Sequence, residues 1–119
     1  MKVRAIDFVM LGVADMDRAL RFYKDTLGLD FPITGGYGSW AESDTPPVAL
    51  ALDADGPPPG QLVLAFAVDD VDAATEELRA QGVPILKEPF ATDACYQSQV
   101  RAPDGNVVLL HKRNDGTVG

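Results

Sequence analysis

The sequence predicts an α+β fold in which two βαβββ modules in tandem form a curled eight-stranded cup. The main observation is an internal repeat: VADMDRALRFY at Val13–Tyr23 returns as VDDVDAATEEL at Val68–Leu78, with Val, Asp, Asp and Ala at a constant offset of 55 residues. Each copy follows an apolar, strand-like run and precedes short strand-like pieces separated by Gly, Pro and Asp. Each half therefore has one strand, one helix and three further strands.

In the first half, the apolar run 6–13 predicts a strand and Asp15 is the expected N-cap of the following helix. Met16, Ala19, Leu20, Tyr23 and Leu27 recur at helical spacing, and Gly28 is expected to end the helix. The pieces 30–34, 38–42 and 48–52 are the three remaining strands.

In the second half, residues 62–68 form the first strand, Asp70 is the cap and the helix runs to Gly82. The strands 84–90, 96–100 and 106–112 follow, with a tight turn at Pro103–Asn106 before the last one. The chain is thus predicted to be a single domain, 1–119, with modules 1–54 and 61–113. They are joined by a linker at 53–61 that contains three consecutive prolines and is expected to be extended.

Composition narrows the possible functions. The N-terminal stretch MKVRAIDF has no apolar signal region and no run approaches a membrane span, so a cytoplasmic protein is expected. A formal net charge of −8 argues against nucleic-acid and anionic-lipid binding and favours a cationic or neutral ligand. The single cysteine, Cys95, can form neither an intramolecular disulfide nor a multi-cysteine zinc site.

The stretches VADMDRALRFYKDTLGL, VDDVDAATEELRAQGV and APDGNVVLL resemble the vicinal oxygen chelate superfamily, which contains glyoxalase I, extradiol dioxygenases and bleomycin-resistance proteins. The resemblance spans nearly the whole chain and implies the glyoxalase/bleomycin-resistance fold. In metal-dependent relatives, His or Gln on the first strand of each half and Glu on the last strand of each half hold a divalent metal inside the cup.

In this sequence the four positions of those metal ligands, which we call the four slots, are occupied by Phe8, Val63, Ala49 and Leu109. None of these side chains has a lone pair that could displace water from a divalent cation. The resemblance therefore implies a metal-free member, and no cofactor is expected.

Strand alternation and the motif positions predict which residues line the cup. The expected ligand-binding residues are Phe8, Met10, Tyr37, Trp40, Glu42, Ala49, Val63, Phe90, Tyr96, Gln97, Gln99, Arg101, Leu109 and His111. Aromatic rings would stack on planar ligands, while amide and guanidinium groups would orient them. Several have plainer interpretations: Trp40 as packing, Tyr37 as a turn residue and His111 as a partly exposed strand end.

The leading hypothesis is a metal-independent binding protein of the bleomycin-resistance kind. It would confer antibiotic resistance by sequestering an aromatic or hydrophobic antibiotic-like molecule, and the resemblance implies a homodimer. No nucleophile–base arrangement or nucleotide motif is visible, so no catalytic residue is assigned. Two alternatives stay open: a glyoxalase-type lyase, isomerase or dioxygenase with an atypical metal site involving His111, Glu42 or a dimer mate, and a regulatory module with a vestigial cup.

Overall fold

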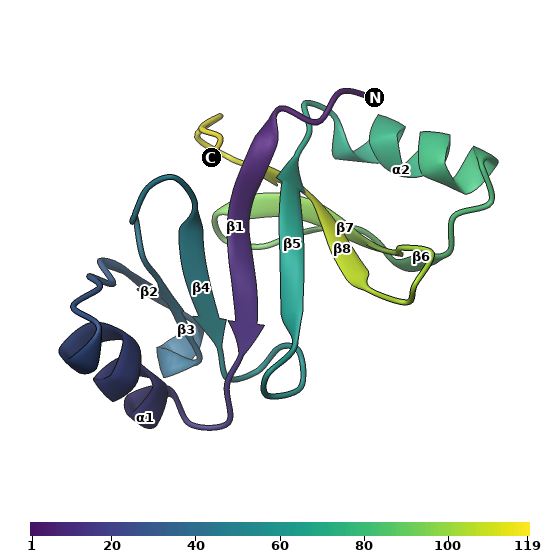
Figure 1. The fold of residues 1–119 in the computed structure, drawn as a ribbon. Coiled ribbons are helices and arrows are strands. Elements are labelled where there is room, and N and C mark those ends of the chain that lie inside the picture. The colour runs from purple at the N-terminus through teal and green to yellow at the C-terminus, as the bar shows by residue number, and fades with distance from the viewer. The chain divides into compact units, whose positions relative to one another are not determined.

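The computed structural model describes residues 1–119, and its element order is the predicted one (Figure 1). The first half contains β1 (Ala5–Gly12), α1 (Met16–Leu20), η1 (Arg21–Thr26), β2 (Ile33–Gly35), η2 (Gly36–Gly38), β3 (Trp40–Glu42) and β4 (Ala49–Asp53). The second half contains β5 (Leu62–Ala67), α2 (Val71–Ala80), β6 (Ile85–Ala91), β7 (Cys95–Arg101) and β8 (Val107–Arg113). The α+β class with two βαβββ modules is confirmed.

The chain divides into two compact units. The first-half unit is Phe8–Val63, and the second-half unit combines Met1–Asp7 with Leu64–Gly119. The amide of Arg4 donates to the carbonyl of Ala67 at 2.9 Å, which holds the start of the chain against the end of β5. The predicted single domain with modules 1–54 and 61–113, and the cup between them, stay predictions.

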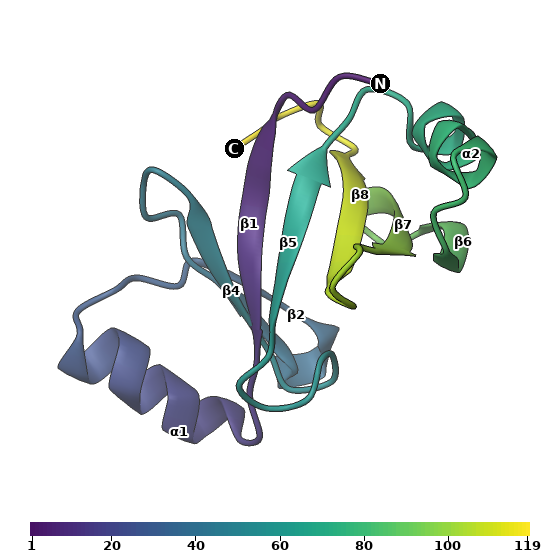
Figure 2. The ribbon, with the colours of Figure 1, turned by 45° about the vertical axis from the view of Figure 1, so that its right-hand side comes forward.

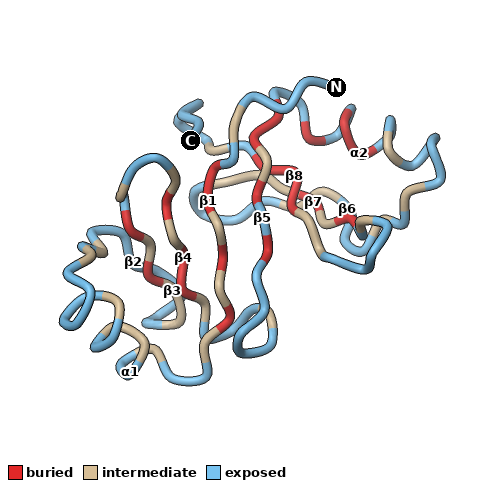
Figure 3. Tube along the Cα trace, in the orientation of Figure 1, coloured by how far each residue is buried: buried red, intermediate tan, exposed pale blue.

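In the first-half unit the strand order is β2-β3-β4-β1. β1 and β4 are parallel, with Phe8 opposite Ala49, and β3 is antiparallel to both β2 and β4. The helix predicted at 16–27 changes its winding: α1 continues as the wider π-helix η1, in which the amide of Leu27 donates to the carbonyl of Phe22. No residue of α1 or η1 is fully buried, as Figure 3 shows.

In the second-half unit the strand order is β5-β8-β7-β6. β5 and β8 are parallel, and β7 is antiparallel to both β8 and β6. Helix α2 packs against β6, β7 and β8, and both ribbon views show it next to these strands (Figures 1 and 2). The core beneath α2 consists of Val68, Val71, Ala74, Val100 and Leu110.

Both helices begin as local chemistry predicts. Asp15 accepts a hydrogen bond from the amide of Arg18 at 3.1 Å, and Asp70 accepts one from the amide of Ala73 at 2.9 Å. Gly28 and Gly82, the expected helix stops, have φ of 82° and 83°, a conformation that glycine adopts without strain. Neither helix has the length and apolar content required to cross a bilayer.

Candidate functional site

The candidate site in the first-half unit is the sheet face that carries Phe8 and Met10. Strand register places Phe8 beside Ala49, and it places Met10 and Glu42 on either side of Ala51. Residues opposite one another on paired strands share a face, so these side chains lie together as predicted. Phe8, Met10, Ala49 and Ala51 are all buried.

Two aromatic rings meet on this face. The centroids of Phe8 and Trp40 are 5.5 Å apart, with the ring planes inclined at 55°, within the range of favourable aromatic contacts. Trp40 is half-buried and lies opposite Asp53, and burial raises the pKa of the Asp53 carboxyl. The face therefore combines a tilted aromatic pair with small alanines.

Tyr37 does not join this pair in the structure. It lies in η2 with a φ of 55°, and its side chain is fully exposed. The interpretation of Tyr37 as a turn residue describes this geometry better than a place in the floor of a site.

The candidate site in the second-half unit is the face of its sheet opposite α2. Register aligns Lys87 with Gln99, Phe90 with Gln97, Gln97 with His111, and Gln99 with Leu109. Five of the predicted residues therefore share one face with the buried Ala65 and Ala67 of β5: Phe90, Gln97, Gln99, Leu109 and His111. Arg101 lies on the same face at the exposed end of β7, where its Nη1 donates to the carbonyl of Gly105 at 2.9 Å.

Tyr96 requires a correction, because it lies on the other face of β7. Its ring packs against the core beneath α2, and its hydroxyl donates to Asp72 of that helix at 2.7 Å. That hydrogen bond raises the pKa of the Tyr96 hydroxyl. The physical reason is strand alternation: a residue next to Gln97 in a strand cannot point to the same side.

A polar cluster centred on the buried Asp7 lies beside this face, and we call its members the Asp7 network: Asp7, His111, Arg113 and Gly119. Nδ1 of His111 is 2.6 Å from Oδ2 of Asp7. Arg113 donates to Oδ1 and to the carbonyl of Asp7 at 3.3 and 3.1 Å, and the amide of Gly119 donates to Oδ1 at 2.9 Å. Asp7 is fully buried and His111 is 3% exposed, so His111 is not the partly exposed strand end that one interpretation expected.

The electrostatics of His111 follow from this cluster. Burial by itself would lower the pKa of the imidazole, because a charged ring is poorly solvated there. The hydrogen bond to Asp7, the neighbouring Cys95 side chain and the negative charge of Asp7 outweigh burial and raise the pKa to about 9. His111 is therefore an imidazolium at neutral pH.

Sequence reasoning missed Asp7 and Arg113 as site residues. One signal was available: Asp7 interrupts the otherwise apolar strand AIDFVML, and a charge in a buried strand requires a partner. Its partner lies 104 residues away along the chain, which local patterns cannot indicate.

The four slots that correspond to metal ligands in the family are all buried and apolar: Phe8 is 4% exposed, Ala49 8%, Val63 5% and Leu109 3%. Phe8 lies opposite Ala49, whereas Leu109 lies opposite Ala65, two residues after Val63 on β5. No three His, Cys, Asp or Glu side chains gather into a group that could hold a metal ion. The residues at these positions do not fit the family's metal.

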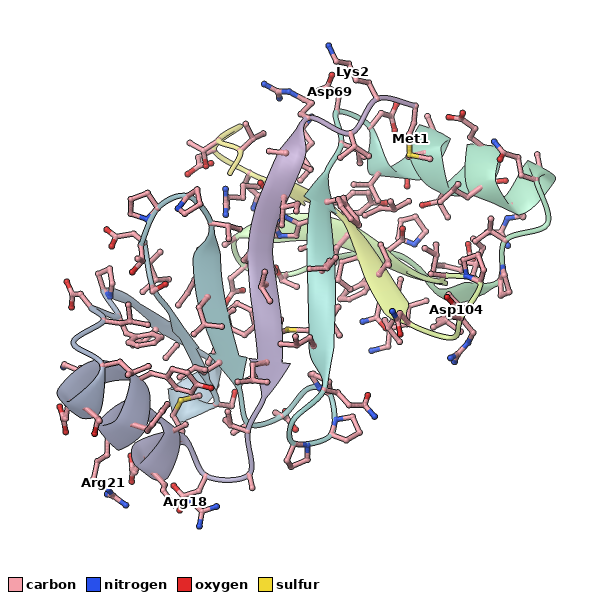
Figure 4. All side chains as sticks on the ribbon, viewed as in Figure 1. Met1, Lys2, Arg18, Arg21, Asp69 and Asp104 are labelled. Atoms are coloured by element: carbon pink, nitrogen blue, oxygen red, sulfur yellow. The ribbon has the colours of Figure 1, made fainter.

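Two hollows lie on helix surfaces and contain none of the predicted ligand-binding residues. One, of about 300 Å³, is lined by Asp17, Leu20, Arg21, Lys24 and Asp25. Figure 4 shows Arg18 and Arg21 pointing outward from this helix into solvent. The other, of about 160 Å³, lies between the N-terminus and α2, where Glu77 binds the terminal ammonium at 2.5 Å.

Comparison with known proteins gives one family. The model of the Glyoxalase/Bleomycin resistance protein/Dioxygenase superfamily matches residues 5–110. An uncharacterized protein of Mycolicibacterium smegmatis is 33% identical over 86 residues, which cover 71% of this chain and 73% of that protein.

Solved structures share this fold. The methylmalonyl-CoA epimerase of Mycobacterium tuberculosis is 26% identical, with a TM-score of 0.70 over 93% of this chain and 89% of that one. A glyoxalase/bleomycin resistance protein/dioxygenase superfamily member from Vibrio splendidus is 16% identical, with a TM-score of 0.68 over 89% of this chain and 96% of that one. The second likeness is one of fold alone.

Proposed function

The chain belongs to the Glyoxalase/Bleomycin resistance protein/Dioxygenase superfamily, and within it we propose a metal-independent small-molecule binding protein that sequesters an aromatic or hydrophobic, antibiotic-like ligand. The resemblance predicted from the repeat, and with it the glyoxalase/bleomycin-resistance fold, is confirmed. Membership alone does not select an activity, because one fold supports several chemistries. The proposal therefore depends on the residues of the site.

One observation carries it: the four slots where metal-dependent relatives place ligands hold Phe8, Ala49, Val63 and Leu109. Divalent metals are held by nitrogen, oxygen or sulfur atoms, and these four side chains contain only carbon and hydrogen.

The surface that replaces the donors suits an apolar ligand. The Phe8–Trp40 pair supplies rigid aromatic area, and the neighbouring alanines leave room for a planar molecule. A homodimer, as the resemblance implies, and a cytoplasmic location, as expected from the N-terminal stretch and the lack of a long apolar run, are part of this proposal.

Fluorescence of Trp40 tests the proposal directly, because the chain has only one tryptophan. Bleomycin and a panel of planar aromatic antibiotics are titrated, and we expect at least one to give a saturable change that Phe8→Ala weakens. Phe22→Ala is the matched control, because Phe22 is a half-exposed aromatic residue of the same unit that contacts Tyr23 instead of Trp40. Absence of any response across the panel would contradict sequestration.

Metal analysis gives an independent check. Protein purified without chelators is expected to contain less than stoichiometric divalent metal by elemental analysis. A tightly held ion in one-to-one ratio with the chain would overturn the proposal.

A second candidate is an isomerase, lyase or dioxygenase, and one observation favours it. His111 and Asp7 form a buried imidazole–carboxylate pair, a combination that enzymes use for general acid–base chemistry. The similarity to methylmalonyl-CoA epimerase suggests methylmalonyl-CoA as the first substrate to assay. Turnover that is lost in His111→Gln would establish this candidate, whereas saturable binding of a ligand that is recovered unchanged would favour sequestration.

A further inference from the structure

One buried side-chain atom, Oε1 of Gln97, lacks a hydrogen-bond partner. The other buried polar side chains are paired. The hydroxyl oxygens of Thr75 and Ser98 are 2.8 Å apart. The hydroxyl of Ser43 accepts from the amide of Leu50 at 3.0 Å, and the side chains of His111 and Asp7 are hydrogen-bonded to each other. A buried acceptor without a donor costs free energy, so its retention calls for an explanation.

The neighbours of Gln97 define the surroundings of this atom. On the strand β7, Gln97 lies opposite Phe90 of β6 on one side and His111 of β8 on the other. Its alternating neighbours Tyr96 and Ser98 point toward α2, so Gln97 points to the face that α2 does not cover. The amide thus stands between an aromatic ring and an imidazole.

Nδ1 of His111 faces Asp7, and the Asp7 carboxylate is bound in turn by Arg113 and by the amide of Gly119. Gln97 as a residue is only half-buried, so part of it is accessible although its Oε1 is shielded from solvent.

We propose that Gln97 is the polar anchor of a ligand site on the second-half sheet face, and that the ligand is an aromatic molecule bearing a hydroxyl or amine donor. The ligand's ring would stack on Phe90 while its O–H or N–H donates to Oε1 of Gln97. This inference rests on the proposed binding function and refines it by naming the class of ligand. It favours phenols and aromatic amines over aromatic molecules that carry only acceptors.

Paired probes test the inference. Naphthol and its methyl ether have the same ring, but only naphthol can donate a hydrogen bond. Isothermal titration calorimetry on the full chain should give an affinity for naphthol about tenfold higher than for the ether, as expected for one buried hydrogen bond. In Gln97→Met, an apolar side chain of similar length, the two affinities should become equal while binding of the ether is retained.

Gln81→Met is the matched control, because Gln81 is an exposed glutamine of the same unit that lies at the end of α2, outside the candidate site. It should keep the tenfold preference for naphthol. Chemical denaturation of the ligand-free proteins supplies a readout that separates ligand binding from a structural role. Gln97→Met should be at least as stable as the wild type, because the substitution removes an unpaired acceptor.

Each contrary outcome has a distinct meaning. If neither probe nor any aromatic antibiotic binds, the proposed function itself fails. If the wild type binds both probes equally, or prefers the ether, the role of Gln97 is overturned while the binding function stands. A marked loss of stability in Gln97→Met would assign Gln97 to the fold and overturn the inference in the same way.

Discussion

The buried pair of His111 and Asp7 should make the stability of the protein depend on pH. In the folded state the pKa of His111 is about 9, whereas its ordinary value is 6.5. A raised folded-state pKa means that folding favours the protonated ring. The stabilisation is therefore complete below about pH 6.5 and disappears as the pH rises through about 9.

The size of this effect follows from the two pKa values. Their difference, at about 1.36 kcal/mol per pH unit, corresponds to about 3 kcal/mol of unfolding free energy. That is a large part of the about 5–15 kcal/mol typical of a small domain. The fold should nonetheless persist above pH 9, because Arg113 and the amide of Gly119 still bind the Asp7 carboxylate.

The assay has an unusually clear signal, because His111 is the only histidine. Its imidazole resonances, followed by NMR against pH, should titrate with a midpoint near 9, and urea denaturation should show the matching loss of stability. In Asp7→Asn the midpoint should fall well below 9, because burial then acts with less opposition. Asp69→Asn, which breaks only the exposed pair with Arg4, should leave the midpoint unchanged.

A midpoint at or below 6.5 in the wild type would refute the reasoning. So would a midpoint near 9 that survives Asp7→Asn, because the carboxylate would then not be its cause.

Three further predictions concern stability and are measured by chemical denaturation. Thr75→Val should lower the unfolding free energy by about 1–3 kcal/mol, because it leaves the buried hydroxyl of Ser98 without its partner. Adding Ser98→Ala should recover part of that loss, and equal stability of the single and double variants would contradict this. Asp70→Ala should cost about 1 kcal/mol through loss of the α2 cap, and an unchanged midpoint would exclude that role. Gly12→Ala should be strongly destabilising, because a Cβ there would lie 2.2 Å from the carbonyl oxygen of Pro57. Gly35→Ala should be tolerated, because the nearest atom to its Cβ, Cδ1 of Trp40, would be 4.0 Å away. Similar losses of stability in both variants would argue against the close contact at Gly12.

Some of the site could have been read more fully from the sequence. Period-two alternation already separates Tyr96 from Gln97, so the two could not line the same face, and the structure shows that separation. The same rule places Gln97 and Gln99 on one face of β7, and Leu109 and His111 on one face of β8, but only the register of the two strands joins these pairs.

The sequence alone determined the order of the elements, the helix starts at Asp15 and Asp70, and the apolar character of the four slots. These features depend on interactions within a few residues, or on residue identity itself, so they can be predicted from the sequence. Only the tertiary structure decided that Asp7 binds His111 and Arg113, and that Oε1 of Gln97 is left unpaired. The physical reason is that these states depend on strand register and on contacts between residues far apart in the chain, which no local pattern encodes.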